Sequence, residues 1–359
     1  MIILGIETSC DETALALYDQ KRGLLGHVLH SQINQLTKYG GVIPEIAARY
    51  HIQYLTPLLT TLLKTHHLSL KDVNFIAYTK GPGLIGSLLT GIAFAKSLSF
   101  ALKIPALGIH HLEGHLLACF IQEAEQLPIQ VPEFPFLVLL ASGGHTMLIQ
   151  ANELGNYKIL GETLDDAAGE ALDKTAKLLE LSPPNGKTLS IFAERAQNLN
   201  HFCFPKPLAN QNTLNFSFSG LKTAAMLQIK KLITNQELLD FKNTEAKFAL
   251  TKANLASAFQ EAVMDSLVTK CRQALRTTKL NRLVIAGGVS ANKSLRNKLL
   301  SLEQEPLNNT PIKIFFPKLE FCTDNAAMIA IAGLMRAVHG FKDLNLDLEA
   351  LPRWNLETV

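Results

Sequence analysis

One pattern in this sequence constrains the fold more than any other: two short apolar stretches joined by a polar turn, found twice. The first copy consists of residues 2–6 and 14–18 around the turn 7–12, and the second of 136–140 and 146–150 around 141–145. Apolar runs of this length, bounded by turn residues, predict β-hairpins. Two halves that each begin with a hairpin predict a duplicated architecture with two lobes and a cleft between them.

The remaining segments alternate between strand and helix patterns. Residues 44–63 have apolar side chains at helical spacing, and Pro57 is expected to kink or split that helix. Further helices are predicted at 87–102, 110–123, 165–181, 252–277, from 292 onward and at about 323–340, and strands at 73–78 and 282–286. Residues 182–220, rich in Pro, Asn, Gly and Ser, predict irregular chain. This order predicts an α/β protein with mixed sheets.

Length and composition narrow the class of protein. A chain of 359 residues is too long for one compact core and predicts about two domains. With 47% hydrophobic and 18% charged residues it is not an intrinsically disordered chain. A net charge of +3 excludes a strongly basic surface, so any contact with nucleic acid must come from local patches.

Cysteines and apolar segments indicate the compartment. The five cysteines are far apart, odd in number and without a Cys-x-x-Cys pair, which argues against a disulfide framework or a zinc ribbon. The apolar start has no basic leader, and the longest uncharged stretch, 134–152, is broken by Pro135 and by the turn 142–145. We expect a cytoplasmic protein that does not span a membrane.

The pair His111 and His115 is a candidate metal site. Residues four apart share a helix face, so both imidazoles could bind one ion, and two surface or capping histidines are the alternative. A zinc-protease motif requires Glu directly after the first His, but Leu112 stands there, so a protease is excluded. Spacing alone does not join Asp324 to this pair, because it could equally cap the last helix.

Glycine-rich turns suggest where an anion could bind. Ser142-Gly143-Gly144-His145 and Gly287-Gly288 each follow a predicted strand, and their amides could approach a phosphate, with Ser290 and Asn292 near a sugar or base. An ordinary hairpin turn or helix entry is the alternative for each. Two such turns favour a nucleotide-like ligand.

Two other phosphate motifs fail on their details. The segment 81–86 matches G-x-G-x-x-G, but no Asp or Glu occurs between Asp72 and Glu113 to bind a ribose, so a tight strand-to-helix turn is favoured. Gly186-Lys187-Thr188 resembles the end of a P-loop, yet Leu181 stands where its first glycine belongs.

Charged clusters have two interpretations. Asp166, Glu170 and Asp173 would share a helix face, either as a solvated acidic face relieved by Lys174 and Lys177 or as ligand-binding groups. The basic clusters could meet phosphates or simply be solvated; they comprise Lys222, Lys230, Lys231, Arg272, Arg276, Lys279 and Arg282.

Eight ordered motifs, read together, resemble a known family. They are IETSCDET (6–13), YGGVIPE (39–45), GPGL (81–84), HHLEGH (110–115), SGGHT (142–146), FSFSGLKT (216–223), GGVSAN (287–292) and CTDN (322–325). In this order they are similar to the bacterial tRNA N6-adenosine threonylcarbamoyltransferases, and the resemblance runs from residue 2 to Arg353-Trp354.

The resemblance implies a fold and a set of site residues. The fold is that of the actin-like/sugar kinase/Hsp70 class, with RNase-H-like lobes at 1–109 plus about 325–359 and at 110–324, and a ligand and metal cleft between them. His111, His115 and Asp324 are implied to ligate one metal, iron more than zinc. The residues implied to bind the donor are Ala141, Ser142, Gly143, Gly144, His145, Asp173, Gly186 and Asn292. Two departures concern this set: Ala141 replaces the usual Val, and Pro184-Asn185-Gly186-Lys187 replaces Pro-Gly-Gly-Pro.

The activity implied is transfer of a threonylcarbamoyl group from threonylcarbamoyl-AMP to N6 of adenosine 37 in tRNAs that read ANN codons. The implied partners are tRNA, a smaller paralogous subunit and a small P-loop ATPase. Two alternatives stay open: an ATPase or phosphotransferase of the same fold, and a nucleotide-binding scaffold.

Overall fold

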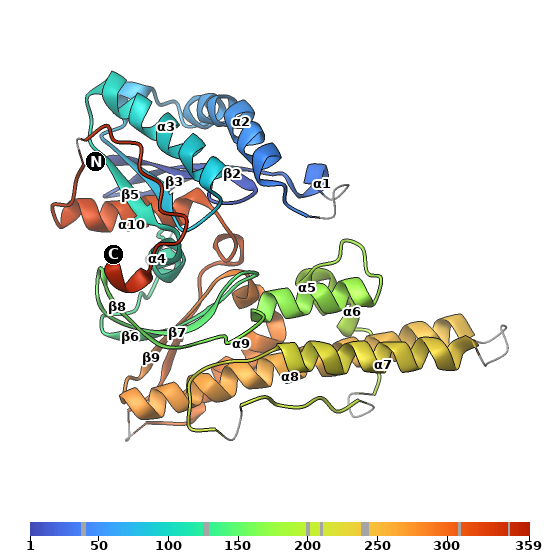
Figure 1. The fold of residues 1–359 in the computed structure, drawn as a ribbon. Helices are drawn as coiled ribbons and strands as arrows, with labels where there is room; N and C mark the ends of the chain where they lie inside the picture. Colours follow the sequence, from blue (N-terminus) through green and yellow to red (C-terminus); the bar gives the residue numbers. More distant parts are fainter. Residues whose placement is uncertain are drawn as a thin grey trace. The chain divides into compact units, whose positions relative to one another are not determined.

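The computed structural model (Figure 1) describes residues 1–36, 41–124, 129–198, 202–208, 211–237, 244–307, 310–343 and 345–359. Tyr39 and Gly40, which begin one of the eight motifs, lie outside the described residues.

The chain divides into two compact units. The first comprises Met1–Pro132, Glu153–Tyr157 and Pro317–Val359, and the second Glu133–Asn152 and Lys158–Phe316. These boundaries differ from the lobes expected from the sequence, since 110–132 and 317–324 cluster with the N-terminal unit. The physical reason is packing, because the helix that follows residue 110 contacts both the strand before it and the last long helix.

The first unit is built on a mixed five-stranded sheet in the order β3-β2-β1-β4-β5. Its strands are β1 (Ile2–Glu7), β2 (Glu12–Asp19), β3 (Gly23–Ser31), β4 (Phe75–Gly81) and β5 (Ala106–His110). The antiparallel pairs are β1–β2 and β2–β3, whereas β1–β4 and β4–β5 are parallel. The predicted first hairpin is therefore confirmed.

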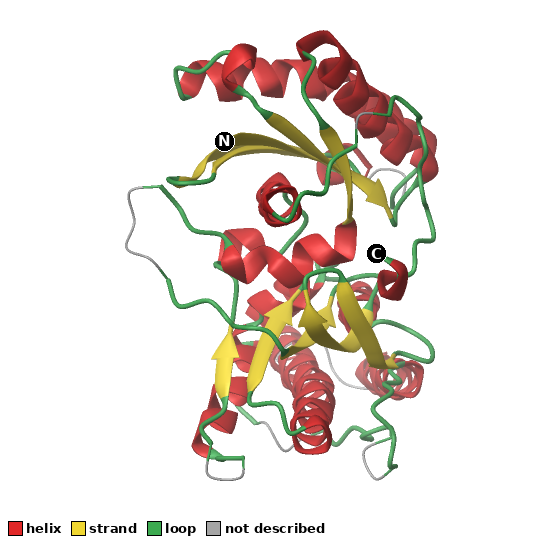
Figure 2. Cartoon of the chain, turned by 90° about the vertical axis from the view of Figure 1, so that its left-hand side faces the viewer, coloured by secondary structure: helices red, strands yellow, loops and turns green. Residues whose placement is uncertain are grey.

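Helices cover both faces of this sheet (Figures 1 and 2). On one face lie α2 (Pro44–Thr65) and α3 (Ile85–Leu102), and on the other lies α10 (Ala326–Val338). Glycines allow α10 to approach closely: a Cβ on Gly5 would lie 2.4 Å from the Ala326 carbonyl oxygen, and one on Gly333 would lie 2.3 Å from the Ala77 Cβ. The first unit also contains the short helices α1 (Ile33–Leu36) and α4 (His111–Leu117).

The second unit repeats the strand order of the first. Its sheet runs β10-β9-β6-β7-β8, formed by β6 (Phe136–Ala141), β7 (Thr146–Glu153), β8 (Asn156–Glu162), β9 (Arg282–Ala286) and β10 (Lys313–Phe315). Numbered from its own hairpin, this is again 3-2-1-4-5, with an antiparallel first pair and parallel fourth and fifth strands. The predicted duplication is confirmed, and each unit has RNase-H-like topology.

The α-helices among the described residues of the second unit are α5 (Ala168–Leu178), α6 (Gly186–Ala193), α7 (Ser219–Glu237), α8 (Thr244–Thr278) and α9 (Lys293–Leu300). They pack around α8, which also contacts β6. The core between helices and sheet contains fully buried Phe218, Phe259, Leu137 and Leu283.

Several predicted elements need correction. The helix expected at 110–123 is only α4 followed by a 3₁₀ turn at Ala118–Phe120, because the chain then bridges to the edge strand through Leu24 and Glu123. The segment 182–220, expected to be irregular, contains α6 and the start of α7. Pro57 lies inside one helix, α2, which is not split.

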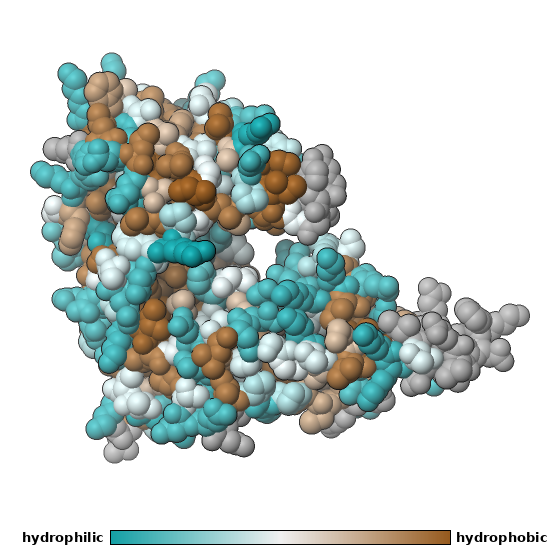
Figure 3. All heavy atoms as spheres, viewed as in Figure 1, coloured by the Kyte–Doolittle hydropathy of each residue, from teal (hydrophilic) through white to brown (hydrophobic). Residues whose placement is uncertain are grey.

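Helix α3 is the one helix among the described residues that is long and apolar enough to cross a membrane by length and composition. It packs on α2 and β4 and buries residues such as Leu88 and Ile92, which is typical of a core helix. Its outer side exposes Ile85 and Phe100, and Figure 3 shows apolar and polar patches interspersed over this unit.

Candidate functional site

The two histidines of the candidate metal site lie on α4, at the carboxyl end of β5. The helix starts directly after the strand, and the His110 side chain caps it by accepting a hydrogen bond from the Leu112 amide at 3.1 Å. His111 and His115 are one turn apart on the same face, with ring centroids 4.8 Å apart and planes at 86°. Both are buried. The sequence spacing thus places two imidazoles at one point.

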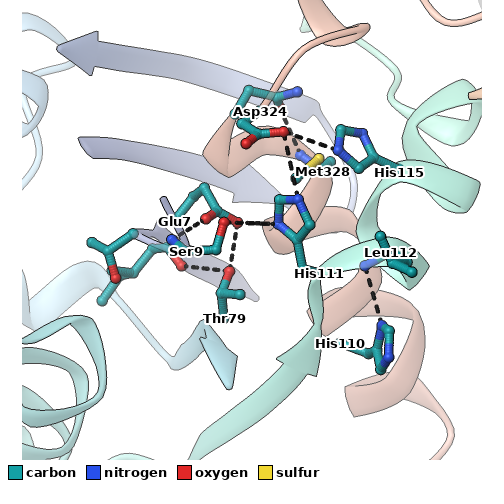
Figure 4. Close-up of polar contacts among 12 residues, drawn as sticks. Glu7, Ser9, Thr79, His110, His111, Leu112, His115, Asp324 and Met328 are labelled. Carbon is teal, nitrogen blue, oxygen red and sulfur yellow. Dashed lines mark hydrogen bonds and ion pairs between the residues drawn. The ribbon is translucent and has the colours of Figure 1, made fainter. Parts of the chain in front are cut away.

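Asp324 joins them from a distant part of the chain. Its Oδ1 lies 3.0 Å from Nε2 of His115 and 3.5 Å from Nε2 of His111 (Figure 4). The expected alternative role of Asp324 as a helix cap is wrong, because Asn325 caps α10 by accepting from the Met328 amide. This leaves the Asp324 carboxylate facing the two histidines.

The three groups fit a transition-metal ion. One ligand atom from each, all lying within 4.8 Å of one another, makes a two-imidazole, one-carboxylate set. Ligands bound at about 2.0–2.2 Å in tetrahedral geometry are roughly 3.4 Å apart, close to the separations of 3.0 and 3.5 Å. Imidazole with carboxylate suits zinc and ferrous iron, and three protein ligands leave a position open.

A second carboxylate stands behind His111. Glu7, the last residue of β1, lies 3.0 Å from Nδ1 of His111 through Oε2. Burial opposes its ionisation, but His111 holds the pKa of Glu7 below its ordinary value. Burial likewise disfavours protonated His111, yet Glu7 and Asp324 raise its pKa well above the usual range. The carboxylates therefore make this a site of high affinity for positive charge.

A buried ion pair connects the elements that carry the three ligands. Glu113, between the two histidines on α4, receives two hydrogen bonds from Arg336 on α10, at 2.7 and 2.8 Å, and one from the Tyr157 hydroxyl at 2.7 Å. Glu113 is fully buried. Its carboxylate is bound by Arg336 and Tyr157, and it joins α4 to the helix that follows Asp324.

Sequence reasoning gave no role to Asp11 and Glu12, at the end of the first hairpin turn. Burial and the neighbouring Asp11 carboxylate raise the pKa of Glu12 to about 9, with Asp324 adding to the effect. The signal that could have found them is their acidity within an otherwise apolar hairpin.

The predicted anion-binding turn has its own internal bonds. The Ser142 amide donates to the His145 carbonyl at 2.8 Å, and the His145 amide donates to Ser142 Oγ at 3.1 Å. Gly143 and Gly144 at the tip are exposed, and a Cβ on either would have no atom within 4 Å. The amides of the two glycines are thus the accessible donors of the turn.

Other predicted donor-binding residues lie close to this turn or to each other. A Cβ on Gly287 would lie 2.4 Å from the carbonyl oxygen of Ala141, so this second glycine turn packs on the end of β6. Asp173 accepts from the Gly186 amide at 2.6 Å, and burial raises the pKa of Asp173. These contacts place Asp173 and Gly186 at one point.

Asn292 is already engaged within the second unit. Its Oδ1 caps α9 by accepting from Leu295, and its Nδ2 donates to Ser190 Oγ at 2.7 Å and to Gln260 Oε1 at 3.0 Å. Sequence reasoning missed Ser190 and Gln260, which lie outside the eight motifs.

The acidic cluster has a structural explanation. Asp165 and Asp166 precede α5 rather than lie in it, and Asp165 accepts from the Phe218 and Ser219 amides at the start of α7. Asp166 pairs with Lys222 and Lys174, so Lys222 is not an unpaired phosphate-binding group. The interpretation of Asp166 as part of a helix face is wrong.

Solved structures identify the class of fold. The chain is similar to (R)-2-hydroxyglutaryl-CoA dehydratase component A of Acidaminococcus fermentans, with 14% identity, a TM-score of 0.53 and coverage of 94% of this chain and 99% of that one. It is also similar to HypF of T. kodakarensis, with 12% identity, a TM-score of 0.57 and coverage of 94% and 48%. With the duplicated sheets, these likenesses define an α/β protein of the actin-like/sugar kinase/Hsp70 fold, as expected.

Sequence comparison identifies the family within this class. The family model for tRNA N6-adenosine threonylcarbamoyltransferase matches residues 23–331. The enzyme of that name from Nitrosomonas europaea is 50% identical over 361 aligned residues, covering 100% of each chain. The chain belongs to the tRNA N6-adenosine threonylcarbamoyltransferase family. The predicted family and transferase activity are confirmed, and the phosphotransferase and scaffold alternatives are not favoured.

Proposed function

We propose that this chain transfers a threonylcarbamoyl group from threonylcarbamoyl-AMP to N6 of adenosine 37 in tRNAs that read ANN codons, with release of AMP. The family name supports the group, the tRNA and the atom, and the resemblance of the motifs supports the donor and the position. The observation that carries the chemistry is the convergence of His111, His115 and Asp324 within 4.8 Å.

These three residues would hold one divalent metal ion, with iron preferred over zinc. The ion would supply Lewis-acid chemistry, which polarises an acyl or phosphoryl oxygen. The role of the chain is to present two neutral imidazole nitrogens and an ionised carboxylate, because metal ligands must be deprotonated.

The turn of the second unit would bind the adenylate of the donor. Gly143 and Gly144 are exposed at the tip of the turn, and a Cβ on either would meet nothing within 4 Å, so a phosphate has room to approach their amides. The binding set is Ala141, Ser142, Gly143, Gly144, His145, Asp173, Gly186 and Asn292. Donors aimed at the departing phosphate stabilise the charge that develops on it.

The reaction itself is an acyl transfer. The exocyclic N6 amine attacks the carbamoyl carbon, and the new C–N bond forms as the carbon–oxygen bond to phosphate breaks. AMP leaves with the electron pair, and the proton of N6 passes to solvent. An anticodon loop exposes its base edges, so no duplex has to open. A smaller paralogous subunit, a small P-loop ATPase and a cytoplasmic location are further parts of this proposal, supported by the resemblance.

Nucleoside analysis tests the proposal. Depleting the protein should remove threonylcarbamoyladenosine from bulk tRNA, and the wild-type chain should restore it. Unchanged levels after depletion would reject the transferase. A chain carrying His111→Ala and His115→Ala should fold, lose metal and fail to restore the nucleoside. Full restoration by that variant would reject the metal centre and leave the family activity standing.

A further inference from the structure

Glu7 is a buried carboxylate with three hydrogen-bond donors. Its exposed fraction is 0%. Oε1 accepts from the Ser9 amide at 2.5 Å, and Oε2 accepts from the Thr79 hydroxyl at 2.6 Å while lying 3.0 Å from Nδ1 of His111 (Figure 4). A buried carboxylate is costly unless its oxygens are satisfied. The donors come from the hairpin turn, β4 and α4, so they fix the carboxylate in one position.

The position of Glu7 determines which nitrogen of His111 carries the proton. Nδ1 of His111 has two neighbours, Glu7 Oε2 at 3.0 Å and Ser9 Oγ at 3.2 Å. An ionised carboxylate only accepts hydrogen bonds and a hydroxyl can also accept one, so both contacts fit a protonated Nδ1. When an ion displaces the proton of Nε2, the imidazole is neutral and the Nε2 lone pair is available to bind that ion. Nε2 is the atom that lies 3.5 Å from Asp324 Oδ1. Glu7 therefore directs a metal-binding lone pair into the site.

His115 provides an internal comparison. Its Nε2 also faces Asp324, but its Nδ1 is buried with no hydrogen-bond partner in the part of the chain that the structure describes. Nδ1 of His111 thus contacts a carboxylate, whereas the His115 ring makes its polar contact with Asp324 through Nε2. A metal-bound histidine commonly donates its second N–H to a carboxylate, which fixes the tautomer and raises ligand basicity.

We propose that Glu7 is a positioning residue of the metal centre, holding His111 as the Nδ1–H tautomer with Nε2 turned toward the ion. Thr79 and Ser9 hold Glu7 in turn. This inference rests on the proposed metal centre, and it concerns metal affinity rather than the transfer step. Removing such a partner commonly weakens metal affinity about 10- to 100-fold.

Metal titration of the full chain tests the role of Glu7. Apo protein is titrated with Co²⁺, followed by visible absorption, and with Zn²⁺ against a competing chelator. The test variant is Glu7→Gln, which keeps the size of the side chain and removes its charge. The matched control is Thr13→Val, because Thr13 Oγ1 is the partner, at 2.8 Å, of Nδ1 of another buried histidine, His51.

We expect Glu7→Gln to bind both ions about 10- to 100-fold more weakly, while Thr13→Val binds as the wild type does. A folded Glu7→Gln chain with affinity within twofold of wild type would overturn the inference and leave the metal centre intact. If His111→Ala does not weaken metal binding, the metal centre itself is refuted, and the inference falls with it.

A measurement on the wild type keeps the inference testable if Glu7→Gln does not fold. Long-range ¹⁵N–¹H NMR of the zinc-loaded protein reports which imidazole nitrogen of each histidine carries a proton. We expect His111 to show a protonated, slowly exchanging Nδ1 and zinc at Nε2. Zinc at Nδ1, or a rapidly exchanging Nδ1 proton, would overturn the role of Glu7.

Discussion

The first hairpin turns of the two units occupy the same place in the same sheet order but carry opposite chemistry. The β1–β2 turn is bounded by the carboxylates Glu7 and Glu12, and the β6–β7 turn, Ser142–His145, has a glycine tip without any carboxylate. The β1–β2 turn therefore offers oxygen acceptors, and the β6–β7 turn offers amide donors. The fold places a turn at the same position in both sheets, and the residue types in it decide whether it attracts a cation or an anion.

The β1–β2 turn and the β6–β7 turn are packed in a similar way. A Cβ on Gly83, which follows β4, would lie 2.5 Å from the Ser9 carbonyl oxygen, and one on Gly287, which follows β9, would lie 2.4 Å from that of Ala141. In each unit a glycine after the fourth strand thus supports the hairpin. The duplicated frame is shared, and the two units differ in the side chains that lie on and around the hairpin turn.

The largest effect is expected from removing both histidines of the proposed metal site, which lies beside the acidic β1–β2 turn. His111→Ala with His115→Ala deletes two of three ligands and should lower transfer activity at least about 1,000-fold, since Lewis-acid stabilisation is worth several kcal/mol. The measurements are tRNA modification in the reconstituted system and metal content by mass spectrometry. A metal-free variant with wild-type activity would contradict the proposal that the reaction needs a cation bound in the first unit.

Arg336→Met tests the buried Glu113–Arg336 ion pair, which joins α4, the helix of the two histidines, to α10. The change leaves Glu113 buried without its cation, and we expect a loss of about 3 kcal/mol in unfolding free energy, the lower end for a broken buried pair, because Tyr157 still donates. Chemical denaturation measures this loss. The double variant Arg336→Met with Glu113→Leu should be more stable than Arg336→Met alone. The reverse order would contradict the proposed cost of leaving Glu113 buried without its cation.

Gly287→Ala tests the glycine that packs on the end of β6, directly before the β6–β7 turn. Its φ of 83° and the carbonyl oxygen 2.4 Å from a new Cβ predict a loss of about 2 kcal/mol in stability. Thermal and urea unfolding would measure it. If the variant were as stable as wild type, the glycine would not be the packing residue that the geometry indicates.

Gly144→Ala, in the β6–β7 turn, is expected to change stability the least of these variants. The new Cβ meets nothing within 4 Å and φ is not positive, so stability should change by less than about 1 kcal/mol. The KM for the donor adenylate should nevertheless rise about tenfold, because the methyl group occupies the face that the phosphate would use. An unchanged KM would remove the turn from the binding set.

Local patterns predicted the hairpins and the duplicated architecture because buried strands are short apolar runs between turns. They missed β3, whose His27 and His30 interrupt the apolar run along an edge strand. They also missed α6 and the start of α7, which lie in a stretch rich in helix-breaking residues. There, tertiary contacts decide: Asn185 caps α6, and Asp165 caps α7 from 54 residues away.

For the candidate site, spacing predicted that His111 and His115 share a face, but it could not connect them to Asp324. That connection depends on the packing of α10 beside α4, which no local pattern encodes, and only the family resemblance supplied it. Glu7 was equally beyond reach, since its neighbours His111 and Thr79 are 104 and 72 positions away.

The discontinuity of the first unit has a consequence for biosynthesis. Asp324 follows His115 by 209 residues, and α10 follows later still. At roughly 5–20 residues per second, a ribosome needs about 10–40 s to translate that interval. The first unit therefore lacks its last helix until the whole second unit has emerged, so His111, His115 and Asp324 come together only at the final stage of translation or after it.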